Sequence, residues 1–96
     1  MQLEIITPEA NIFSGEADAV QFPGLDGSFQ VLNGHAAIIS ALVKGDVKVD
    51  LAAAYDDSEN ASDKIVVDSS NKKTIRVAIK GGVIEMLNNK VIVLAE

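Results

Sequence analysis

The sequence has no cysteine and no tryptophan, and aromatic residues make up only 4% of its 96 residues. Without cysteine, neither a disulfide framework nor a thiolate metal site can form. With so few aromatic side chains, the hydrophobic core has to consist of valine, isoleucine, leucine and alanine. A chain of this length is one small domain that buries a modest fraction of its surface. We therefore expect residues 1–96 to form a single domain with an aliphatic core.

Basic residues and long apolar runs are also scarce. The sequence contains 8 Lys and Arg against 14 Asp and Glu, for a net charge of −6, and an acidic domain repels nucleic-acid phosphates. The longest apolar stretches, such as residues 36–43, are far shorter than the roughly 20 residues that cross a bilayer. The first residues lack the basic and apolar regions of a signal peptide. The sequence predicts a cytosolic protein with no nucleic-acid partner and no direct membrane insertion.

Short β-type segments alternate with turn signals along most of the chain. Residues 47–51 show the period-two alternation of a half-buried strand, and Asn88-Asn89 between two β-branched runs is typical of a hairpin loop. This pattern predicts an all-β fold, a flattened β-sandwich or barrel of about nine to ten short strands. We expect strands near residues 3–7, 16–22, 28–32, 47–51, 65–68, 74–79, 83–87 and 90–94, and a hairpin turn at Lys44–Asp46. Residues 11–15 fit a short link or a strand fragment. Residues 36–43 fit a strand or a short helix, and the turn that follows favours the strand.

Residues 52–64 depart from this pattern. The segment is polar and acidic, and Tyr55 is its only bulky apolar residue. Strand patterns resume on both sides, which favours a surface loop over a linker between domains. We expect a mobile acidic loop here.

His35 is the only histidine and thus the only side chain with an ordinary pKa near neutrality. Catalysis would need a partner group in the same cleft, and zinc would need three or four ligands. The favoured interpretation is that His35 orders the turn at Gly34 through a backbone hydrogen bond, with a contact to a partner as the second. The glycines at 24, 27, 81 and 82 lack the spacing of a phosphate-binding loop. We expect no catalytic, cofactor-binding or metal-binding residues.

Three stretches of the chain read, in order, LEIITPE, FSGEADAVQFPGLDGSFQVLNGHAAIISALVKGDVKV and RVAIKGGVIEMLNNKVIVLAE. Together they resemble the N-terminal domain of the epsilon subunit of F-type ATP synthase, whose mitochondrial equivalent is called delta. Asn33 and Ala37 stand where the family pattern has prolines. The matching motifs fall on Thr7-Pro8, Phe13-Ser14-Gly15, Pro23-Gly24 with Gly27, Gly34-His35-Ala36, Gly81-Gly82 with Glu85, and Val93-Leu94-Ala95.

The resemblance implies a non-catalytic subunit of the central stalk, or rotor, that needs no cofactor. Such a subunit couples rotation of the membrane ring to the gamma subunit during proton-driven ATP synthesis. Gamma and the ring of ion-carrying subunits are the expected partners. The expected location is peripheral, on the cytoplasmic face of the inner or plasma membrane, as part of the complex. By position in the family, the ring contact is expected at Gly24, Leu25, Asp26, Gly27, Ser28 and Phe29. The gamma contact is expected at Asn33, Gly34, His35, Ala36, Ile38, Gly81, Gly82 and Val83.

The sequence stops at Glu96, where the usual family member continues into a two-helix C-terminal domain. In the family that helical hairpin inhibits ATP hydrolysis and in some members binds ATP. We expect no C-terminal helical domain in this chain and neither of these activities. Two other interpretations stay open, a free-standing β-sandwich module that binds a peptide or carbohydrate and an enzyme centred on His35.

Overall fold

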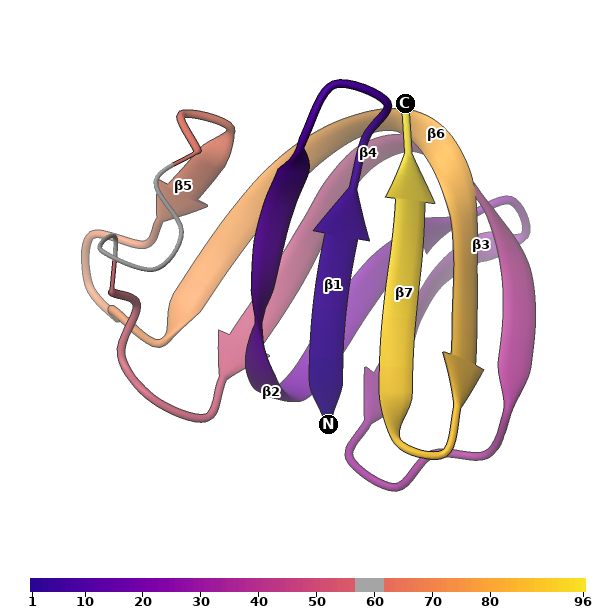
Figure 1. Ribbon diagram of the computed structural model, residues 1–96, viewed down its shortest axis with the longest axis horizontal. Helices are drawn as coiled ribbons and strands as arrows, with labels where there is room; N and C mark the ends of the chain where they lie inside the picture. The colour runs from indigo at the N-terminus through magenta and orange to yellow at the C-terminus, as the bar shows by residue number, and fades with distance from the viewer. Residues whose placement is uncertain (57–61) are drawn as a thin grey trace.

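The computed structural model describes residues 1–56 and 62–96, and within them the chain is all β (Figure 1). The expected all-β fold class is confirmed. The described residues include no helix, and hence none that could span a membrane. The expected acidic loop falls partly on residues 57–61, which lie outside the described residues. The strands are β1 (Gln2–Ile6), β2 (Asn11–Gly24), β3 (Gly27–Leu32), β4 (Ile38–Leu51), β5 (Ile65–Val67), β6 (Thr74–Leu87) and β7 (Lys90–Ala95).

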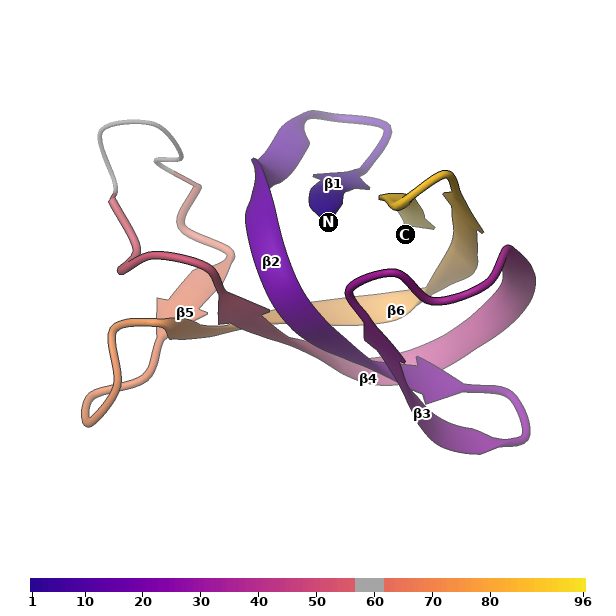
Figure 2. The ribbon, with the colours of Figure 1, turned by 90° about the horizontal axis from the view of Figure 1, so that it is seen from below.

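The strands form a sheet that closes on itself. Its order is β1-β7-β6-β4-β2-β3, and the first half of β2 pairs back onto β1. Figure 2 shows β2, β4 and β6 curving around a common interior that β1 borders, with β5 to one side. The β1–β7 pair is parallel and every other pair is antiparallel. Because of this closure, β3 and β5 are the strands that have a neighbour on one side only.

The long strands account for the main difference from the sequence prediction. The expected turn at Lys44–Asp46 was wrong, because β4 passes through these residues and stays paired with β6 on both sides of them. Residues 11–24 likewise form one strand, with an irregular register between Ala17 and Ala19, and residues 74–87 form another. Pairs of predicted short strands are thus single bent strands. The described residues contain seven strands where about nine to ten were expected.

Gly81 and Gly82 lie where β6 changes the side that faces the core. Before them Val77 and Ile79 are buried, and after them Ile84 and Met86 are buried, so the alternation slips by one residue. The register with β4 does not slip. The two glycines have φ angles of +154° and +151°, a conformation that residues with a Cβ atom rarely adopt. They let the β4–β6 ribbon bend from one layer of the sandwich to the other.

The core is aliphatic, as the composition predicts. Its largest fully buried side chains are those of Phe22, Leu3, Ile5, Ile75, Ile84 and Met86. Burying a side chain of this size contributes about 1.5–3 kcal/mol of hydrophobic free energy. The aromatic contact is between Phe22 and Phe29, whose ring centroids are 5.5 Å apart. That contact holds β3 against the core through its neighbour β2.

Asp68 organises the turn between β5 and β6. Its Oδ1 accepts hydrogen bonds from the hydroxyl of Ser70 at 2.7 Å and from the Ser70 backbone N–H at 2.8 Å. The Arg76 guanidinium lies 3.2 Å from Oδ2. The bond from the Ser70 hydroxyl, then the bond from its amide and the contact with Arg76, lower the pKa of Asp68 from 3.8 to about 2.

We predict that Gly82→Ala destabilises the fold far more than Gly81→Ala. The two positions share nearly the same φ angle, so both substitutions carry a backbone strain of about 1–3 kcal/mol. At Gly82 the new Cβ would also overlap the carbonyl oxygen of Leu94, whereas at Gly81 the nearest atom is the Leu42 oxygen at 3.4 Å. Urea unfolding of both variants, followed by circular dichroism, measures the difference. Equal losses of unfolding free energy would contradict the proposed close approach of β6 to β7.

We also predict that Asp68→Asn weakens the acid dependence of stability. The folded-state pKa lies below the unfolded value, so the stabilisation is present above about pH 4 and is lost as the pH falls toward 2. In this window the free energy of unfolding should fall less steeply for the variant than for the unchanged chain. Urea midpoints measured from about pH 6 to pH 2 test this, with Asp63→Asn as the control for loss of an exposed carboxylate. Parallel profiles for Asp68→Asn and the unchanged chain would rule the effect out.

Candidate partner-binding surface

The hairpin between β2 and β3 presents the residues that were expected to contact the ring. Gly24 pairs with Gly27, and Leu25 and Asp26 form the exposed tip. A Cβ at Gly24 would lie 2.6 Å from the Gly27 oxygen and 2.7 Å from the Phe29 ring, so the turn requires glycine there. Leu25 is 68% exposed, whereas Phe29 is half-buried against the core. The hairpin therefore offers Leu25, Asp26, Gly27 and Ser28 to a partner and turns Phe29 inward.

The turn after β3 contains the first part of the expected gamma contact. The His35 backbone N–H donates to the Leu32 oxygen at 3.0 Å. Gly34 has a φ angle of +81°, so the positive φ falls on Gly34, and Asn33 does not adopt one. The exposed imidazole Nδ1 of His35 lies 2.7 Å from the Ala36 oxygen.

A group of side-chain hydrogen bonds ties this turn to the β6–β7 hairpin. The Asn33 Oδ1 accepts from the Asn89 amide at 2.9 Å, and the Asn89 Oδ1 accepts from the Gly34 N–H at 2.8 Å. The Met1 ammonium also donates to Asn33 Oδ1 at 2.9 Å. We call the Asn33–Asn89 pair the amide clasp. The sequence analysis missed it, because nothing local indicates that two turns 56 residues apart meet.

The ammonium of Met1 has two further acceptors. It lies 2.9 Å from the Ala17 carbonyl oxygen and 3.4 Å from the Glu16 carboxylate. A buried charge is costly unless it is paired and hydrogen-bonded, and this one is. The Met1 ammonium thus connects the amide clasp to the backbone of β2.

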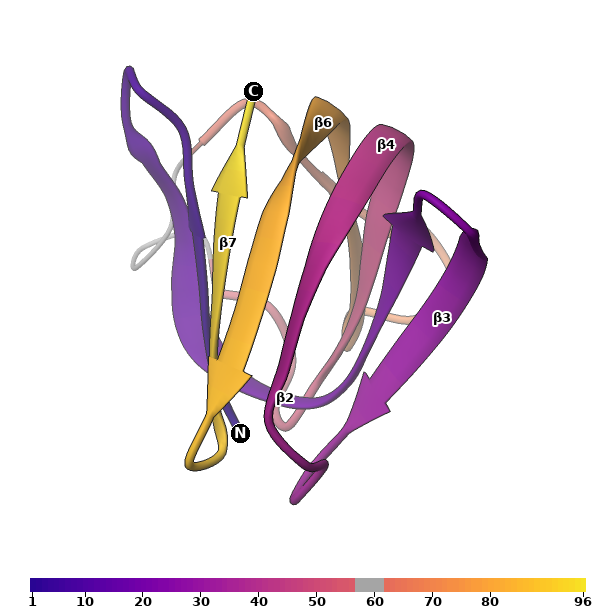
Figure 3. The same ribbon diagram turned by 90° about the vertical axis from the view of Figure 1, so that its right-hand side faces the viewer.

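The solvent-facing sides of β1, β7, the second half of β6 and the first half of β4 form one surface rich in apolar side chains, which we call the outer face. Figure 3 shows β7, β6 and β4 side by side. Large apolar side chains stand exposed on it, with Ile39 at 74%, Leu94 at 57%, Leu87 at 55% and Val83 at 44%. Its further members, from strand register and burial, are Gln2, Glu4, Ile6, Ala41, Val43, Glu85, Lys90 and Ile92.

The residues of the expected gamma contact divide between this face and the interior. Val83 belongs to the outer face, and Asn33, Gly34, His35 and Ala36 lie in the exposed turn at one end of it. Ile38 packs against the core, Gly81 is buried and Gly82 is half-buried.

Strand β4 connects the hairpin tip to the outer face. The Leu25 N–H donates to the Ala41 oxygen at 3.2 Å, and Ala41 in turn pairs with Val83 on β6. The expected ring contact and the expected gamma contact therefore lie on either side of one strand. Backbone hydrogen bonds thus link the hairpin tip to the outer face through β4.

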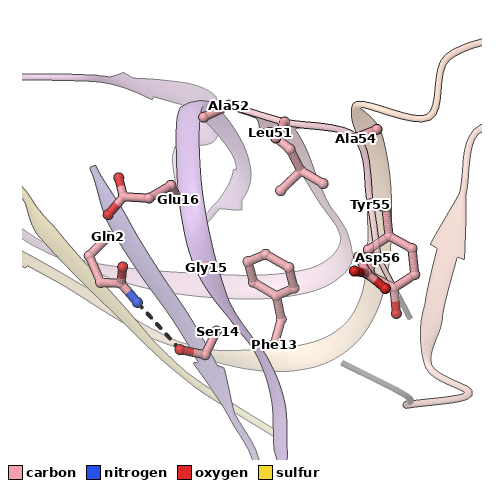
Figure 4. Close-up of a pocket in the computed structure, with 11 residues that line it drawn as sticks. Gln2, Phe13, Ser14, Gly15, Glu16, Leu51, Ala52, Ala54, Tyr55 and Asp56 are labelled. Atoms are coloured by element: carbon pink, nitrogen blue, oxygen red, sulfur yellow. Dashed lines mark hydrogen bonds between the residues drawn. The ribbon is translucent and has the colours of Figure 1, made fainter. Parts of the chain in front are cut away.

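A separate hollow of about 330 Å³ lies between β2 and the chain that follows β4 (Figure 4). The Phe13 ring and Tyr55 border it, together with the carboxylates of Glu16 and Asp56. The Gln2 amide donates to the Ser14 hydroxyl at 3.3 Å on its far side. Among the described residues that border it, none is a histidine or lysine. Across the described residues, no group of three or more His, Asp or Glu side chains is placed to hold a metal ion.

Comparison with known proteins agrees with the fold and the motifs. A family model described as the beta-sandwich domain of the ATP synthase delta/epsilon chain matches residues 1–59. The chain belongs to this family. The chain is 37% identical over 95 residues to the ATP synthase epsilon chain of Chlorobium limicola. The alignment covers 99% of this chain and 88% of that relative. The epsilon chain of Salinibacter ruber is 35% identical over 96 residues, and this chain covers 58% of it.

Solved structures with the same fold come from larger assemblies. One match is a chain in the cryo-EM structure of the Tetrahymena thermophila mitochondrial ATP synthase central stalk and c-ring. It aligns with a TM-score of 0.64 at 16% identity, and the alignment covers 99% of the present chain and 62% of the Tetrahymena chain. A chain of the Euglena gracilis mitochondrial ATP synthase aligns with a TM-score of 0.69 at 19% identity, covering 97% of this chain and 48% of that one. At this level of identity the similarity is one of fold.

We predict that the amide clasp can be removed without straining the hairpin. Asn88 and Asn89 have φ angles of +52° and +60°, which glycine adopts freely. Asn89→Gly should cost about 1–2 kcal/mol more unfolding free energy than the matched control Asn88→Gly, because it also loses two hydrogen bonds. In a double-mutant cycle with Asn33→Ala, urea unfolding should give a coupling energy of about 0.5–2 kcal/mol. Strict additivity would show that the two amides do not interact.

Proposed function

We propose that this chain is a non-catalytic subunit of the central stalk of an F-type ATP synthase, where it couples rotation of the membrane ring to the gamma subunit. The observation that carries the proposal is a family match over most of the chain combined with two exposed surfaces on one closed sheet. The subunit acts peripherally on the cytoplasmic face of the membrane. The described residues form no helix that is long and apolar enough to cross a bilayer.

The outer face is the proposed docking surface for gamma. Exposed apolar patches mark protein–protein contacts, and Ile39, Val83 and Leu94 supply its exposed bulk. The turn at Asn33–Ala36 adds polar groups at the rim. A durable rotor contact needs an apolar centre and a polar rim of this kind.

The tip of the β2–β3 hairpin is the proposed contact with the ring. Leu25 is an exposed apolar side chain, and Asp26 beside it is a carboxylate. Both sit on a two-residue turn held by the Gly24–Gly27 pair, so the tip is short and well anchored. A short anchored tip can bear a load without bending.

The proposed role is mechanical. The hollow beside Tyr55 gathers carboxylates and small side chains without a histidine or lysine among its described residues, and the imidazole of His35 lies outside its lining. The alternative of a free-standing module for a peptide or carbohydrate gains no support from the relatives, which are ATP synthase epsilon chains.

Two substitutions test the two contacts against each other. Val83→Asp should weaken binding to purified gamma subunit about a hundredfold or more, because an unpaired carboxylate buried at an interface costs several kcal/mol. Leu25→Asp should leave gamma binding intact and prevent the gamma complex from assembling on detergent-solubilised ring. Val66→Asp, at an exposed valine on β5, is the control that should do neither.

Gamma binding is measured by biolayer interferometry, and ring assembly by co-purification with gamma and the ring. If the unchanged chain binds neither partner, the proposed function is wrong. If Val83→Asp and Val66→Asp bind gamma equally well, gamma does not dock on the outer face.

A further inference from the structure

The outer face carries a carboxylate at its centre. Strand register places Glu85 directly across from Ile39 on one side and from Ile92 on the other. Val83 and Leu87 precede and follow it on the same side of β6. Glu85 is therefore surrounded by exposed or half-buried apolar side chains on all four sides.

The charge of Glu85 has no partner within the described part of the chain. The two salt bridges found there join the Met1 ammonium to Glu16 and Arg76 to Asp68. Lys90 lies diagonally across from Glu85, beside Leu87, and forms no ion pair with it. In the free chain, water solvates the exposed carboxylate.

Covering the outer face removes that water. A buried carboxylate left without a hydrogen-bonding or charged partner strongly disfavours association. A wholly apolar partner would meet this penalty at the centre of the contact, where its effect is largest. A partner with an arginine or lysine at the matching point avoids it, because a charge-assisted bond replaces the lost water.

We propose that Glu85 is the specificity-determining residue of the outer face, and that the partner seats a basic side chain over it within an apolar surround. The inference rests on the proposed function, which makes gamma the partner. It adds the chemistry of the contact, since the matching patch of gamma has a guanidinium or ammonium group at its centre. Arginine fits best, because its planar fork binds a carboxylate through two parallel hydrogen bonds.

The same carboxylate disfavours a second copy of this chain as the occupant. A two-fold pairing of outer faces centred on β6 would bring two Glu85 side chains together in an apolar setting, and like charges there repel. The proposal therefore predicts that the isolated chain stays monomeric despite its exposed leucines and isoleucines.

Asp46 provides a control carboxylate away from this face. It is exposed on β4 beyond the bend and lies across from Ala78 on β6. Asp46 belongs to neither the outer face nor the hairpin tip, so removing its charge tests only the net charge of the chain.

The test compares gamma binding by the unchanged chain and by three variants, Glu85→Gln, Glu85→Leu and Asp46→Asn. We expect Glu85→Gln to raise the Kd about thirtyfold, because it leaves the positively charged side chain of the partner without a carboxylate. Glu85→Leu should also bind more weakly, although it adds apolar surface. Asp46→Asn should change the Kd less than about twofold, as for a surface substitution outside the contact. Urea midpoints and sedimentation velocity confirm that each variant is folded and monomeric.

Three results separate the possibilities. Weaker binding by both Glu85 variants, with little effect at Asp46, supports a basic group over Glu85. Equal or tighter binding by Glu85→Leu shows an apolar partner surface and overturns this inference while leaving gamma as the partner. Absence of gamma binding by the unchanged chain overturns the proposed function and this inference with it.

Discussion

The pairing of β4 with β6 is the constraint on which the rest of the structure depends. It runs in one register from Ile38 opposite Met86 to Asp50 opposite Thr74 and crosses both layers of the sandwich. The ribbon bends where Gly81 and Gly82 adopt positive φ angles, and its buried side changes there. Because each half of the ribbon lies in a different layer, the two layers share a continuous backbone. Both proposed contact surfaces are attached to it.

Much of the fold follows from local sequence, and the exceptions have a common cause. The hairpin at Asn88-Asn89 and the turn at Gly34 form where predicted, because their backbone angles depend on the residues at those positions. The Lys44–Asp46 segment has the composition of a turn, yet it is extended because β6 pairs with it on both sides. Pairing with a distant strand overrides the local preference of a segment. Where buried and exposed residues stop alternating regularly, the sequence of that strand alone suggests that the strand ends, although its pairing continues.

The candidate surface was predictable in part. Val83 and the residues of the hairpin tip were expected as contacts by their position in the family, and Val83 lies on the outer face while Leu25 and Asp26 are exposed at the tip. The amide clasp was not, because Asn33 and Asn89 meet only after the sheet closes. The central position of Glu85 was also hidden, since its apolar surround comes from three strands. Residues that share a face through strand pairing cannot be grouped from one segment alone.

Native-state hydrogen exchange of the β4 and β6 amides is the most direct test of the central claim, that the closed sheet moves as one rigid body. The account predicts that protected amides on both sides of the bend, in residues 38–43 and 81–87 and in residues 47–51 and 74–79, exchange only by global unfolding. They should then report one common free energy, equal to that from urea unfolding. If the segment that carries the outer face opened independently at a much lower free energy, Gly81-Gly82 would be a hinge, and the description of the sheet as a rigid coupling element would be wrong.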